Sequence, residues 1–107
     1  MATIIITRLS DRQRKLAGWI IGSMKDVYPE KYLPVLHPAR LEIPLDGYTI
    51  RDKFERLPVV YFIDRLDAFN DDSAHLGQKA ELRKDGMAAL NLANQVRFKF
   101  RKMRGRA

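Results

Sequence analysis

The side chains with the clearest chemical potential lie at the C-terminal end of the chain. No acidic residue follows Asp85, whereas six cations do, so this end carries six of the seven net positive charges. Phe98 and Phe100 lie between the cations. Lysine and arginine neutralise phosphates and release counterions, and an exposed phenylalanine can stack on an unpaired base. The pattern favours a surface that binds nucleic acid mainly through its phosphate backbone, with these candidate contacts: Arg97, Phe98, Lys99, Arg101, Lys102, Arg104 and Arg106.

The residues that could carry catalysis or bind a metal form no recognised motif. The chain has no cysteine, and His37 and His75 lie outside any cluster of ligand residues. Asp64 and Asp67 are three residues apart and could together hold Mg²⁺, but Arg65 lies between them, which is typical of a solvated helix face. There is no glycine-rich phosphate loop, no zinc-protease motif and no glycine-flanked serine nucleophile. We therefore predict a non-enzymatic protein without a catalytic residue, metal or cofactor.

The same basic end also fits a protein partner. It would meet an acidic surface on a larger assembly and raise the association rate. Small size, a dense apolar content and the lack of a catalytic motif suit an accessory or inhibitor protein of this kind, such as those encoded by phages or plasmids. Tyr61, Leu90 and Phe98 are apolar residues left over from the predicted core, so two copies could pair through them. A further interpretation needs no partner, because cations at a terminus also keep a small domain soluble.

The length and composition of the chain indicate how many domains it forms and in which cellular compartment it is found. The 107 residues suit a single domain spanning residues 1–107. The longest apolar runs have about five residues, far short of the roughly 20 that span a bilayer, and the first residues lack the apolar stretch of a secretion signal. We therefore predict a cytoplasmic protein with no membrane partner. Residues 1–85 are nearly neutral, with fourteen basic and thirteen acidic residues, so the positive charge is local to the C-terminal end.

The C-terminal cations must be positioned by the element that carries them, which we predict to be a helix over residues 87–104. Apolar residues recur there at spacings of three and four and form one stripe: Ala89, Leu92, Ala93, Val96, Phe100 and Met103. A strand over residues 96–101 is the alternative, because apolar and charged residues alternate there with a period of two. The helical pattern upstream favours the helix. Either element would expose the cations.

The N-terminal part is expected to contain a strand and a helix. Three consecutive isoleucines favour a short strand over residues 2–7. Ser10 with Gln13 forms the capping box of a helix over residues 11–27. Trp19 could stack on a base, but it falls on the apolar face of that helix, so we expect it in the core.

Four prolines interrupt the next stretch, residues 28–47. Each fixes its own backbone angle and disfavours helix in the residue before it. Because the stretch is also rich in apolar side chains, we expect a packed, irregular connection. It would contain a helical turn at 30–33 and a strand at 40–43 beside the first strand.

The second half of the chain is predicted to be helical. Helices are expected over residues 50–56, from Pro58 to Phe69, and over 74–84, with a break at Asn70–Asp72. Asp85 and Gly86 either end the last of these or let it run into the C-terminal helix. The predicted fold is mainly α, with α+β as the alternative. It is a compact bundle of four to five helices with a short N-terminal strand and the proline-rich connection.

Overall fold

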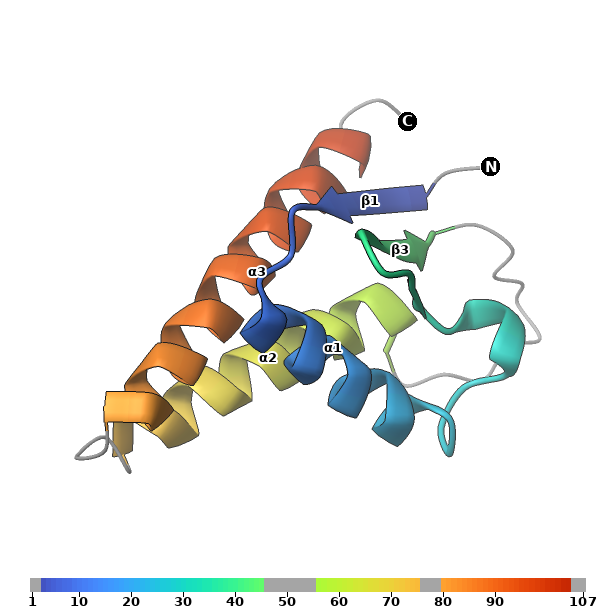
Figure 1. The fold of residues 1–107 in the computed structure, drawn as a ribbon. Helices are drawn as coiled ribbons and strands as arrows, with labels where there is room; N and C mark the ends of the chain where they lie inside the picture. The colour runs from blue at the N-terminus through green and yellow to red at the C-terminus, as the bar shows by residue number, and fades with distance from the viewer. Residues whose placement is uncertain (1–2, 46–55, 76–79, 105–107) are drawn as a thin grey trace.

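The computed structural model describes residues 3–45, 56–75 and 80–104. In chain order the elements are β1 (Thr3–Thr7), α1 (Asp11–Met24), the short 3-10 helix η1 (Glu30–Tyr32), β2 (Val35–Leu36), β3 (Arg40–Pro44), α2 (Pro58–His75) and α3 (Ala80–Arg104). The long helices α2 and α3 pack side by side, α1 packs against both, and β1 lies beside α3 (Figure 1). No helix in these ranges is long and apolar enough to cross a membrane.

The predicted helical fold with a short N-terminal strand is confirmed in outline, but the predicted number of helices is wrong. The described ranges contain three α-helices in place of four to five. The predicted break at Asn70–Asp72 is absent, because α2 continues to His75. Of the two alternatives at Asp85 and Gly86, the structure has the continuous helix, α3. Polar residues and a glycine each disfavour a helix by about 1 kcal/mol or less, which packing between α2 and α3 offsets. The helix predicted over residues 50–56 lies outside the described residues.

The sheet is antiparallel, with the strand order β1-β3-β2. The predicted pairing of the first strand with the strand expected at residues 40–43 is confirmed, with Ile4 opposite Ile43 and Ile6 opposite Leu41. All four side chains are buried, because alternate residues of a strand point to the same face and this face joins the core. Ile5 points to the other face and is 42% exposed.

The predicted capping box is present at the start of α1. Ser10 Oγ accepts a hydrogen bond from the backbone N–H of Gln13, and Gln13 Oε1 accepts one from the backbone N–H of Ser10, both at 3.1 Å. Gln13 is buried, and its Nε2 donates to Asn91 Oδ1 of α3 at 2.9 Å. One side chain therefore caps α1 and ties it to α3. The helix ends at Met24, three residues before the predicted end at Val27, where the chain turns toward the proline-rich connection.

The proline-rich connection packs into the core over its described part, residues 28–45. Tyr28, Tyr32 and Leu33 are buried, and the Tyr28 hydroxyl donates to the backbone oxygen of Arg56 at 2.9 Å. The predicted helical turn is present as η1. All three helices and the sheet contribute to one apolar core, whose largest fully buried side chains include Ile4, Met24, Ile43, Phe62, Leu66, Leu92 and Val96.

Candidate nucleic-acid interface

The C-terminal part of α3 carries most of the predicted contact residues. Residues 96–101 are helical, so the strand alternative is wrong. The centre of the apolar stripe is fully buried, at Ala89, Leu92, Ala93 and Val96. Phe98 lies outside this stripe and is 65% exposed. Lys99, Arg101 and Lys102 are exposed on the same part of the helix.

Arg97 differs from the other cations because it is bound to the body of the protein. Its guanidinium forms an ion pair with Asp67 of α2 and donates to Asn94 Oδ1 at 2.7 Å. The charge of Arg97 is therefore largely neutralised, and this residue links α3 to α2. Arg104 is the last residue of α3, and its side chain, like all of Arg106, lies outside the described part of the chain.

The remaining residues surround an exposed aromatic ring. Lys102 Nζ lies 5.7 Å from the centroid of the Phe98 ring, and Lys99 Nζ donates to the main-chain oxygen of Ile5 in β1. Arg101 follows Phe98 by three residues, so the two side chains are neighbours on the helix. We refer to Phe98, Lys99, Arg101 and Lys102 as the basic α3 surface. Beside it lies a cavity of about 320 Å³ between α3 and β1, lined by Thr3, Ile4, Ile5, Phe98, Lys99, Lys102 and Met103.

The expectation that Trp19 lies in the core is wrong, because its side chain is 57% exposed. The buried stripe of α1 runs through Gln13, Leu16, Ala17, Ile20 and Met24. Its centre falls near Gln13, between Ile20 and Met24. Gln13 and Ala17 are polar and small, so they are easily overlooked when large apolar residues are counted, and leaving them out shifts the apparent centre toward Trp19. At 3.6 residues per turn, Trp19 lies roughly 120° from this centre. The tryptophan consequently stands at the margin of the buried face.

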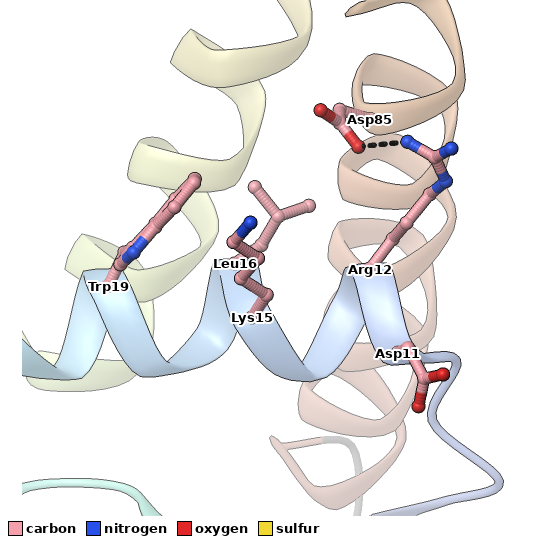
Figure 2. A pocket seen from close by; sticks show the side chains of 6 residues that line it. All are labelled: Asp11, Arg12, Lys15, Leu16, Trp19 and Asp85. Atoms are coloured by element: carbon pink, nitrogen blue, oxygen red, sulfur yellow. Dashed lines mark hydrogen bonds and ion pairs between the residues drawn. The ribbon is translucent and has the colours of Figure 1, made fainter. Parts of the chain in front are cut away.

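Trp19 lines an open pocket of about 460 Å³ between α1 and the beginning of α3 (Figure 2). Lys15 Nζ lies 5.2 Å from the centroid of the Trp19 ring, and Arg12 Nη1 binds Asp85 Oδ1 at 2.6 Å. The pocket is completed by Asp11 and Leu16. None of these residues was among the predicted contacts. The available signal was the spacing of Lys15 and Trp19, which places a cation one helical turn from an aromatic residue.

The acidic side chains offer no metal site in the described ranges, where no group of three potential ligands comes together. Asp64 binds Arg56 at 2.5 Å, and Asp67 binds Arg97. Each carboxylate of the pair considered for Mg²⁺ therefore faces an arginine, which competes with any cation.

Comparison with protein-family models, with curated proteins and with solved structures finds no match to this chain.

Proposed function

We propose that this protein binds single-stranded nucleic acid through the basic α3 surface. The observation that carries the proposal is the exposure of Phe98, at 65%, with the Lys102 ammonium group over its ring. An aromatic ring among cations is the combination that binds single strands, because the ring stacks on an unpaired base while the cations neutralise the adjoining phosphates.

The arrangement supports recognition of the backbone and of unpaired bases, without reading of base edges in a duplex groove. A recognition helix contacts base edges mainly with its N-terminal residues. In α3 the basic α3 surface lies near the C-terminal end, and the exposed cations of the first turns, Arg83 and Lys84, lie outside it. Binding should therefore depend strongly on salt and weakly on sequence. Three cations that each neutralise one phosphate give a slope of about −2 in a plot of log K against log salt.

The test is a titration of a fluorescently labelled single strand of about twelve nucleotides, followed by anisotropy at about 50 and 200 mM salt. Phe98→Ala should lower the affinity about tenfold, because it removes a stacking contact, and should leave the salt slope unchanged. Lys102→Ala should lower the affinity and make the slope shallower by about 0.7, because one phosphate contact is lost.

Met87→Ala serves as the matched control, since Met87 is also an exposed apolar residue of α3, at 71%, but lies outside the basic α3 surface. It should bind like the wild type. Absence of binding at about 10 µM protein and 50 mM salt, where basic proteins usually bind nonspecifically, would refute the proposal. Equal losses in Phe98→Ala and Met87→Ala would also contradict it.

A second candidate function is docking on an acidic protein, as an accessory or inhibitor protein would. The observation that favours it is the outer edge of β1, which pairs with no strand among the described residues. The Ile5 oxygen at this edge accepts a hydrogen bond from the Lys99 ammonium group, which an added strand would displace. An extended acidic segment could add to this edge as a fourth strand while its carboxylates meet Lys99 and Lys102.

An alternating Glu-Val peptide should then protect the amides of β1 from hydrogen exchange, and an alternating Lys-Val peptide should not.

A further inference from the structure

The indole of Trp19 borders two cavities. The larger, of about 460 Å³, is the open pocket between α1 and α3 (Figure 2). The smaller, of about 180 Å³, lies between α1 and α2 and is lined by Leu16, Trp19, Ile20, Ser23, Arg65 and Phe69. A large planar side chain therefore has open space around it, with a cation contributed to each cavity, by Lys15 to the larger and by Arg65 to the smaller.

Core packing does not account for a tryptophan at this position. Its neighbours Leu16 and Ile20 bury their side chains and hold α1 on the core, whereas Trp19 leaves more than half of its surface in water. Tryptophan has the largest aromatic face among the side chains, and such a face binds planar rings by stacking.

The larger pocket has both positive and negative side chains around it, which disfavours a charged ligand and favours a neutral one. Arg12 and Lys15 contribute two positive charges, and Asp85 contributes one negative charge. Asp11 contributes another from a fully exposed carboxylate that points away from Trp19 in Figure 2. Arg12 and Asp85 are also bound to each other. A phosphate would gain little in such a site, because its attraction to the cations is offset by repulsion from the carboxylates. A neutral planar ring is not repelled by these carboxylates, and the Asp85 carboxylate, which has lone pairs beyond the one that binds Arg12, can accept a further hydrogen bond from an amino group on the edge of the ring.

We propose that the Trp19 pocket takes an unpaired nucleobase, stacked on the indole, as a second contact for the strand held by the basic α3 surface. This inference rests on the proposed function. Asp85 and Phe98 are both on α3 and thirteen residues apart, so the two contacts are separated by at least about 20 Å along the helix axis. A stacked strand advances 3.4 Å per nucleotide, so at least about six nucleotides are needed. The path is longer than this axial distance because Phe98 lies about 140° around the helix from Asp85.

Intrinsic fluorescence tests the inference directly, because Trp19 is the single tryptophan of the chain. The wild-type protein is titrated with an unlabelled single strand of about twelve nucleotides, which is long enough to reach both contacts. The emission of Trp19 should be quenched over the same concentration range in which a labelled strand of the same sequence gains anisotropy.

Variants then separate stacking from simple proximity. Trp19→Ala should weaken binding of the labelled strand at least about fivefold, by the same factor at low and high salt, because stacking releases no counterions. Trp19→Phe should restore most of the affinity. Val27→Ala is the matched control, since Val27 is an apolar residue just beyond α1, exposed to 53% and outside both cavities, and it should bind like the wild type.

The possible failures are distinguishable. If the labelled strand gains anisotropy but Trp19 emission is unchanged and Trp19→Ala binds normally, the second contact is refuted and the proposed function stands. The stacking contact is likewise refuted if Trp19→Ala makes the salt slope shallower, because the pocket would then act through charge. If the labelled strand never gains anisotropy, the proposed function is refuted and this inference with it.

Discussion

At the scale of single residues, Gln13 is a buried polar side chain that links two helices. Both ends of its amide form hydrogen bonds. Oε1 accepts from the backbone N–H of Ser10, and Nε2 donates to Asn91 Oδ1. A buried polar group is favourable only while its partners are present, because each unmade bond leaves a desolvated donor or acceptor. Gln13 thus couples the first turn of α1 to the middle of α3.

Gln13→Ala is expected to lower the free energy of unfolding by about 2 kcal/mol, measured by urea denaturation. The change removes half of the capping box and the part-buried hydrogen bonds that Gln13 Nε2 donates to Asn91 Oδ1 and to the Ala88 oxygen. Gln95→Ala is the matched control, because Gln95 also donates to Asn91 Oδ1, at 2.7 Å, but in an exposed position. Its effect should stay within about 0.5 kcal/mol. Equal losses in the free energy of unfolding for the two variants would show that the burial of Gln13 does not contribute to stability.

At the scale of elements, α1 contains two glycines that its packing does not require. A side-chain carbon added at Gly22 would meet no atom within 4 Å, and one added at Gly18 would lie 3.9 Å from Leu36 Cδ2, an ordinary contact. Glycine in a helix interior is less favourable than alanine by roughly 0.8–1 kcal/mol, because a glycine gives the unfolded protein more backbone freedom, which is lost on folding.

Gly22→Ala should therefore raise the free energy of unfolding by about 0.5–1 kcal/mol in the same urea experiment. Gly18→Ala should have a similar effect, since the contact with Leu36 leaves room for a methyl group. A loss of stability in Gly22→Ala would mean that the space beside this residue is needed for packing.

The elements also show which features local sequence can predict. The capping box of Ser10 and Gln13 and the start of α2 at Pro58 depend on a few adjacent residues, and both predictions are confirmed. The end of α2 and the position of Trp19 depend on what packs against each helix, and here the predictions were wrong. The ion pair between Arg97 and Asp67 joins residues thirty positions apart, so no local pattern could have removed Arg97 from the set of exposed cations.

At the scale of the whole molecule, the first strand and the last helix form one structural unit. β1 contacts α3, Lys99 of α3 donates to Ile5, and Phe100 and Met103 pack against the core. The basic α3 surface is therefore carried by an element that the fold needs. Its function has to be tested by single substitutions that leave the helix intact.

Deletion of residues 98–107 should lower the free energy of unfolding by roughly 3 kcal/mol or more, because it removes the half-buried Phe100 and Met103. Lys102→Ala should leave stability within about 0.5 kcal/mol, since Lys102 is exposed. Circular dichroism during heating checks both. A truncated protein with wild-type stability would show that the end of α3 can be removed without harm to the core.

The contact between β1 and α3 also determines when the protein can fold. A ribosome makes the isoleucines of β1 early and the residues of α3 that cover them late, at about 5–20 residues per second. For several seconds the apolar face of β1 has β3 beside it but no α3 to bury it. The nascent chain should thus stay sensitive to proteases and available to chaperones until α3 emerges, and its core should form in a single late step.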